Sequence, residues 1–93
     1  MPTWREYKEH IKDTDPEAYK DLEEAAQMAA IVGAMIQQRN AKGLSQRDLA
    51  AMCGLPQSSV ARIESCKTTP NLNTLLKLFQ PLGLELKVSA AAE

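Results

Sequence analysis

Three residues near the middle of the chain carry side chains that hydrogen-bond well to nucleic-acid bases. Gln57 and Ser58 are neighbours, and Arg62 follows about one helical turn later. A Gln amide bonds adenine bidentately, Arg bonds guanine or a phosphate, and Ser bonds several base edges. Val60 and Ile63 are spaced as the buried residues of a helix, which predicts that the polar residues share its outward face.

A second short helix is predicted immediately before this one. Ser45 is a suitable N-cap, and Asp48, three residues later, completes the form of a capping box. Leu49 and Cys53 follow at helical spacing, and Gly54 ends the helix. Two short helices broken by a glycine are the sequence form of a helix-turn-helix, whose second helix meets the base edges of DNA.

Two more helices are predicted before this pair. Residues 3–6 have the form of a capping box and begin a helix that extends to about residue 12. Asp15 then caps a long helix that continues to about residue 42. We therefore divide the chain into an N-terminal helical segment, residues 1–15, and a helix-turn-helix domain, residues 16–93.

Apolar residues on these two helices need a surface to cover them. Trp4, Tyr7 and Ile11 share one face of the first helix, and Tyr19 and Leu22 begin the apolar stripe of the long one. A protein partner, a second copy of the chain and the chain's own domain are the alternatives for covering them. Stacking of Trp4 and Tyr7 on nucleobases is a further alternative, although aromatic residues at helical spacing more often form a packing face.

The C-terminal part predicts one more helix and a strand. Asn71 caps the helix and Pro81 ends it. Residues 84–88 alternate between apolar and charged side chains, as in a half-buried strand. A lone strand is unstable, so we expect it to pair with the same strand of a second subunit in a two-fold dimer. The apolar residues of this dimer strand are Leu84, Leu86 and Val88.

The formal net charge of −1 hides two oppositely charged segments. Residues 1–30 hold four basic and eight acidic residues, a net charge of −4, whereas residues 31–80 hold six basic and two acidic residues, a net charge of +4. The basic segment suits the phosphates of DNA, with binding that weakens as salt rises. The acidic segment would repel DNA, and a basic protein is one candidate partner for it.

The composition argues against several other classes of protein. No apolar run is long enough to span a membrane and no signal peptide opens the chain, so we expect a cytoplasmic protein. Cys53 and Cys66 show no metal-binding spacing, and we expect neither a metal nor a cofactor. His10 is the only histidine and has no nucleophile or carboxylate constellation near it in the sequence, so we do not expect an enzyme.

Residues 31–83 resemble the Xre/Cro-type (lambda-repressor-like) helix-turn-helix family. The resemblance implies an all-α bundle of about five helices, to which this chain adds the N-terminal helical extension and the short C-terminal strand. The segments in register with the family are Gln38-Arg39, Lys42-Gly43-Leu44-Ser45-Gln46, Asp48-Leu49-Ala50, Gly54-Leu55, Val60-Ala61-Arg62-Ile63-Glu64 and Thr69-Pro70-Asn71 with Leu75-Leu76.

Two positions depart from the family pattern. Pro56 stands where the family commonly has a Ser or Thr that caps the recognition helix, although proline suits a first helical turn. Cys66 stands where a glycine usually follows that helix. A left-handed backbone at Cys66 costs on the order of 1 kcal/mol, so an alternative is that the helix ends in a different conformation there.

The resemblance also implies roles for individual residues. It makes Gln57, Ser58 and Arg62 the contacts to bases, whereas outside such a motif they would simply form a solvated helix face. Arg39 and Glu64 correspond to an ion pair that orients the recognition helix, and the alternative is that the two never meet. The residues expected to contact the DNA backbone are Gln46, Ser59, Lys67, Thr68 and Asn71.

The N-terminal extension and the terminal strand make the chain most similar to HigA-type antitoxins. This resemblance implies a partner, a small basic RelE-like ribonuclease toxin, and a homodimer that represses its own operon by binding a palindromic DNA operator. The alternative is a free-standing Xre-type repressor without a toxin partner. The candidate toxin-binding residues are Trp4, Tyr7, Ile11, Tyr19 and Leu22.

Overall fold

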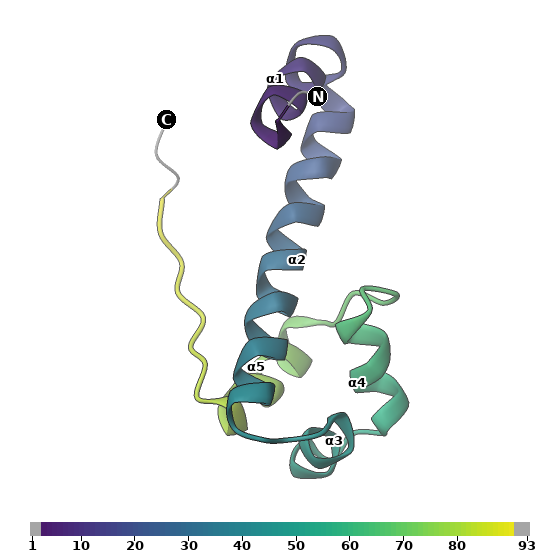
Figure 1. Cartoon of the computed structure of the whole chain (residues 1–93), viewed down its shortest axis with the longest axis vertical. Coiled ribbons are helices and arrows are strands. Elements are labelled where there is room, and N and C mark those ends of the chain that lie inside the picture. The colour runs from purple at the N-terminus through teal and green to yellow at the C-terminus, as the bar shows by residue number, and fades with distance from the viewer. Residues whose placement is uncertain (1–2, 91–93) are drawn as a thin grey trace. The chain divides into compact units, whose positions relative to one another are not determined.

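A computed structural model of the chain describes residues 3–90 and contains five helices (Figure 1). The helices are α1 (Trp4–Thr14), α2 (Pro16–Ala41), α3 (Gln46–Cys53), α4 (Gln57–Glu64) and α5 (Leu72–Leu82). The predicted all-α fold is confirmed. The chain forms two compact units that divide between Ile31 and Val32, so that α2 contributes to both. The division of the chain into residues 1–15 and 16–93, made at the helix break, stays a prediction.

The first unit contains α1 and the first turns of α2. Thr3 and Glu6 form the predicted capping box, and α1 continues to Thr14, two residues further than expected. None of the residues of α1 is buried. Two polar contacts instead join α1 to α2, namely an ion pair between Lys8 and Glu23 (2.6 Å) and the Lys12 ammonium 5.6 Å from the centre of the Tyr19 ring. Hydrogen bonding and charge attraction from Glu23 raise the pKa of Lys8.

The exposed aromatic residues of α1 form a pair. The rings of Trp4 and Tyr7 are stacked, with centroids 5.9 Å apart and planes inclined by 25°. Their exposed fractions are 55% and 46%, which is high for such large side chains. Ile11 on the same helix and Tyr19 and Leu22 on α2 are half-buried.

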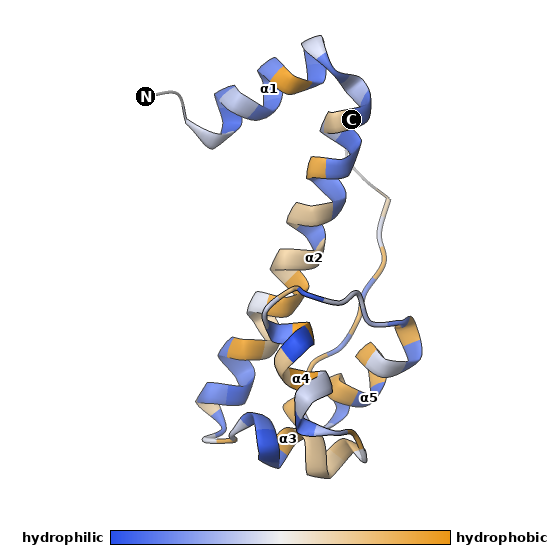
Figure 2. Cartoon of the chain, turned by 90° about the vertical axis from the view of Figure 1, so that its right-hand side faces the viewer, coloured by the Kyte–Doolittle hydropathy of each residue, from blue (hydrophilic) through white to orange (hydrophobic). Residues whose placement is uncertain are grey.

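The second unit has a single apolar core. Helix α3 packs against both α4 and α5. Figure 2 shows hydrophobic positions recurring along these helices, whereas α1 is mostly hydrophilic. The core residues are Val32, Met35, Leu49, Ala50, Val60, Ile63, Leu75, Leu78, Phe79 and Leu82. A hydrogen bond from the Gln38 amide to the Leu82 carbonyl (3.0 Å) joins α2 to the end of α5.

Left-handed residues follow the four helices α2 to α5. Gly43, Gly54 and Gly83 have positive φ angles, and Cys66 shares this conformation with φ of 59°. The prediction that Pro81 ends the last helix was wrong, because Pro81 lies inside α5 and the left-handed Gly83 caps the helix after Leu82. After α4, the N–H of Cys66 donates to the Ile63 carbonyl and the N–H of Lys67 to the Arg62 carbonyl. This is the Schellman pattern, and Cys66 occupies the position that favours glycine.

The predicted C-terminal strand is absent. Residues 84–90 form neither helix nor strand. A strand is defined by backbone hydrogen bonds to a neighbour, and a single copy of the chain offers none to this segment. The N–H of Leu84 is used in the cap of α5, where it donates to the Phe79 carbonyl. Leu86 and Val88 are exposed, so their pairing with a second subunit stays a prediction.

Candidate nucleic-acid interface

Helix α4 separates buried apolar residues from exposed polar ones. Val60 and Ile63 are 0% and 3% exposed and belong to the core. Gln57, Ser58 and Arg62 are all exposed, which leaves their polar groups accessible on the outside of the helix. The structure thus forms the outward polar surface that the spacing of these residues predicts.

The start of α4 has no side-chain cap. Pro56 is its N-cap residue and makes no capping hydrogen bond, as expected from the absence of a hydroxyl or amide at this position. The first backbone N–H groups of a helix are then free to meet solvent or another acceptor. Ser59, one of the residues expected to contact the DNA backbone, is half-buried and does not cap the helix.

Helix α3 begins with the predicted capping box. The Asp48 N–H donates to the Ser45 hydroxyl (3.0 Å), and the Ser45 N–H donates to the Asp48 carboxylate (3.0 Å). The backbone N–H of Ser45, together with its hydroxyl, lowers the pKa of Asp48 because both favour the charged carboxylate. Gly54 ends α3 in the left-handed conformation and leads the chain into α4.

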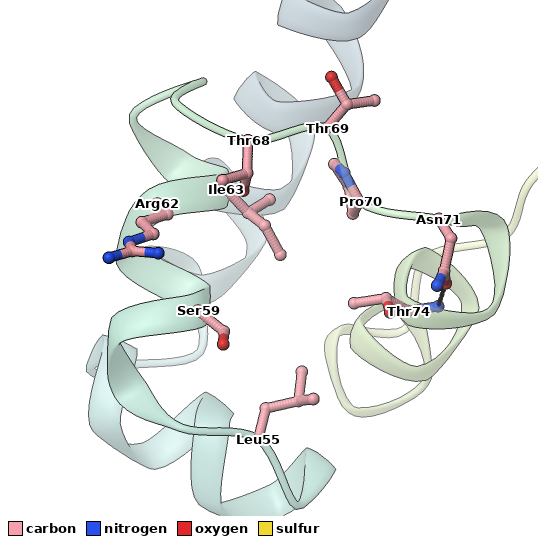
Figure 3. Close-up of a pocket in the computed structure, with 9 residues that line it drawn as sticks. All are labelled: Leu55, Ser59, Arg62, Ile63, Thr68, Thr69, Pro70, Asn71 and Thr74. Carbon is pink, nitrogen blue, oxygen red and sulfur yellow. Dashed lines mark hydrogen bonds between the residues drawn. The ribbon is translucent and has the colours of Figure 1, made fainter.

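An open groove of about 300 Å³ lies between α4 and the start of α5 (Figure 3). Apolar side chains and hydroxyl groups both line it, and the Arg62 guanidinium points away from α5 in Figure 3. In Figure 3 the loop after α4 closes one end of this groove. The lining residues are Leu55, Ser59, Arg62, Ile63, Thr68, Thr69, Pro70, Asn71 and Thr74.

The groove brings together three of the five predicted backbone contacts. Ser59, Thr68 and Asn71 line it, whereas Lys67 is exposed on the adjoining loop and does not. Asn71 is the N-cap of α5, and its side-chain oxygen accepts from the Thr74 N–H (2.8 Å). Because that oxygen is used in the cap, a phosphate would meet the amide nitrogen of Asn71.

The fifth predicted backbone contact, Gln46, lies in a polar cluster with Arg39, Leu44 and Glu64. Arg39 donates through Nε and one terminal nitrogen to the two carboxylate oxygens of Glu64, at 2.7 and 2.8 Å. Its other terminal nitrogen donates to the Leu44 carbonyl (2.8 Å), and the Gln46 amide donates to Glu64 (3.1 Å). Hydrogen bonding to Glu64 raises the pKa of Arg39. We call these four residues, Arg39, Leu44, Gln46 and Glu64, the Glu64 clasp.

Sequence reasoning missed part of this arrangement. Thr69 and Thr74 also line the groove. Their positions in a loop and at a helix start do not by themselves predict a binding site. The hydrogen bond from Gln46 to Glu64 joins residues 18 apart, and no local spacing indicates it.

The described residues also bear on two further kinds of feature, a metal site and a membrane-spanning helix. No group of three or more His, Cys, Asp or Glu side chains between residues 3 and 90 is placed to hold a metal ion. Cys53 is half-buried, its thiol donates to the Lys77 carbonyl (3.4 Å), and burial raises its pKa. Within the same residues, no helix combines the length and apolarity needed to cross a membrane.

Two short helices joined by a tight turn, α3 and α4, the second with an outward polar face, have the form of a helix-turn-helix DNA-binding domain. A family model described as helix-turn-helix matches residues 35–88, which is more than half of the chain. The chain belongs to this helix-turn-helix family.

Comparisons with individual proteins extend the similarity beyond the domain. An uncharacterized HTH-type transcriptional regulator from Haemophilus influenzae is 34% identical over 85 residues, which cover 91% of this chain and 82% of the relative. The HTH-type transcriptional regulator PuuR of Escherichia coli is 44% identical over 48 residues, but these are only 26% of its length. A solved toxin–antitoxin module from Streptococcus pneumoniae matches with a TM-score of 0.74 and 32% identity, over 98% of this chain and 96% of that one.

Proposed function

We propose that this protein is a transcriptional regulator that reads DNA with the exposed face of α4. The observation that carries the proposal is the joint exposure of Gln57, Ser58 and Arg62 on a helix whose opposite face is buried. The groove beside this face is lined in part by hydroxyl groups, which suit hydrogen bonds to the sugar–phosphate backbone. In this proposal Ser59, Lys67, Thr68, Asn71 and Gln46 are the candidates for backbone contacts.

The regulator is proposed to act as a homodimer on a palindromic operator. Two copies related by a two-fold axis would present two α4 helices to successive major grooves. The exposed side chains of Leu86 and Val88 support a pairing of residues 84–88 between the copies.

We further propose that the protein is a cytoplasmic antitoxin that neutralises a RelE-like ribonuclease toxin. The match to a toxin–antitoxin module includes the N-terminal residues that lie outside the helix-turn-helix family match. The acidic residues 1–30 suit a basic partner. The exposed pair Trp4 and Tyr7, with Ile11, Tyr19 and Leu22, would then form the toxin-binding surface.

The DNA-binding part is tested with the variant Gln57→Ala. The probe is a duplex that the wild-type protein selects from a randomised pool, and affinity is measured by gel shift. We expect a loss of about 1–3 kcal/mol, because one bidentate base contact is removed. Gln80→Ala is the matched control, since Gln80 is also exposed but lies on α5. An unchanged affinity of Gln57→Ala would remove this residue from the reading surface.

The antitoxin part is tested by deleting residues 1–15. The chain is expressed from its native operon, and a small basic protein that copurifies with it and is identified by mass would be the toxin candidate. We expect the deletion to weaken copurification and to leave affinity for the selected duplex unchanged. Equal loss of both activities would contradict separate surfaces. A free-standing repressor, in which residues 1–30 only brace the domain, predicts no copurified toxin from the full chain.

A further inference from the structure

The Glu64 clasp is built by residues from three helices and the turn between two of them. Arg39 lies near the end of α2, Gln46 is the first residue of α3, and Glu64 is the last residue of α4. The Arg39 and Glu64 side chains are only 12% and 5% exposed. One carboxylate at the end of the recognition helix therefore accepts hydrogen bonds from both neighbouring helices.

The contacts of Glu64 explain why an uncharged donor stands at position 46. Two of the three hydrogen bonds to the carboxylate come from Arg39, which already balances its charge. A nearly buried carboxylate with a third acceptor site needs another donor, and a second cation there would leave an unbalanced charge. The Gln46 amide supplies a donor without a charge, at 3.1 Å.

Burial of Val60 and Ile63 fixes which face of α4 is turned to the core that α3 helps to build. The hydrophobic effect itself is non-directional, so a directional contact is needed to define the rotation of α4 more narrowly. The hydrogen bond from Gln46 joins the first residue of α3 to the last of α4 and constrains how α4 turns about its axis. That rotation decides where the Gln57 and Arg62 side chains point.

We infer that Gln46 is a positioning residue, which acts on DNA recognition through Glu64 by holding the orientation of α4. The inference rests on the proposed DNA-binding function. It replaces the role that the sequence predicts for Gln46, which is a contact to a DNA phosphate. The two roles differ in a measurable way. A phosphate contact adds affinity for every sequence alike, whereas orientation of the reading helix matters only where bases are read.

The test compares two duplexes of equal length, one selected by the wild-type protein and one scrambled. Gln46→Ala should lose about tenfold in affinity for the selected duplex, the effect of one lost hydrogen bond to a charged group, and less than about twofold for the scrambled one. Arg47→Ala is the matched control, because Arg47 is exposed on the next position of α3 and should weaken both duplexes alike. Equal losses of Gln46→Ala on both duplexes would overturn the inference.

A second measurement separates action through Glu64 from a direct contact. In a background of Arg39→Met with Glu64→Leu, where apolar residues replace the ion pair, adding Gln46→Ala should change the affinity for the selected duplex by less than about twofold. A full tenfold loss in that background would show that Gln46 acts without Glu64. If the wild-type protein itself does not distinguish the two duplexes, the proposed function fails, which is a different result from either of these.

Discussion

Replacement of Glu64 by alanine should strongly destabilise the second unit. The carboxylate is 5% exposed and accepts hydrogen bonds from Arg39 and Gln46, and its removal leaves the Arg39 guanidinium without its charge partner. Loss of one partner from a buried ion pair costs about 3–5 kcal/mol. We expect about 3 kcal/mol, at the lower end of that range, because Arg39 keeps its bond to the Leu44 carbonyl. This is a large part of the roughly 5–15 kcal/mol typical of a domain.

The measurement is urea unfolding followed by far-ultraviolet circular dichroism. Fluorescence is unsuitable, because the single tryptophan, Trp4, belongs to the first unit. The double variant Arg39→Met with Glu64→Leu should recover most of the loss, since neither charge is then stranded. Arg47→Ala, at an exposed position, serves as the control and should change stability by less than about 0.5 kcal/mol. A Glu64→Ala variant within about 1 kcal/mol of the wild type would refute the cost we assign to stranding Arg39.

Two further changes test the helix ends. Cys66→Gly should stabilise the protein by about 1 kcal/mol in the same urea assay, because Cys66 has a φ of 59° that favours glycine. Gly54→Ala, at a left-handed position where an added Cβ meets open space, should destabilise the protein by a similar amount. Destabilisation by Cys66→Gly or stabilisation by Gly54→Ala would contradict the argument. The lowered pKa of Asp48 stabilises the fold above its unfolded pKa of about 3.9 and ceases to do so as pH falls through the folded value. The stability gap between wild type and Asp48→Asn should therefore be widest near neutral pH and vanish in acid, and a gap independent of pH would exclude this role.

Local sequence signals predicted the helices well because each one is specified by neighbouring residues. The capping boxes at Thr3 and Ser45 involve partners three residues away, and the left-handed ends at Gly43 and Gly54 follow from glycine itself. The strand at residues 84–88 does not form in the single chain, because alternation predicts a face but not the hydrogen-bonding partner that makes a strand.

The candidate site was predictable only in part. Helical spacing and the resemblance together selected Gln57, Ser58 and Arg62, and the structure exposes all three. The resemblance also paired Arg39 with Glu64, which are hydrogen-bonded in the structure. The hydroxyl groups that line the groove come from separate elements, so the spacing of residues in the sequence could not predict that they lie close together.

The sequence by itself determined which helices form and where they begin, which face of each is apolar and how charge divides between the two parts of the chain. Those properties depend on side chains a few residues apart, and their energies are set locally. Only the tertiary structure decided that Gln46 turns toward Glu64, that Cys66 adopts a left-handed backbone, and that a groove opens beside α4. These features depend on how whole helices pack, and many packings are compatible with the same local pattern.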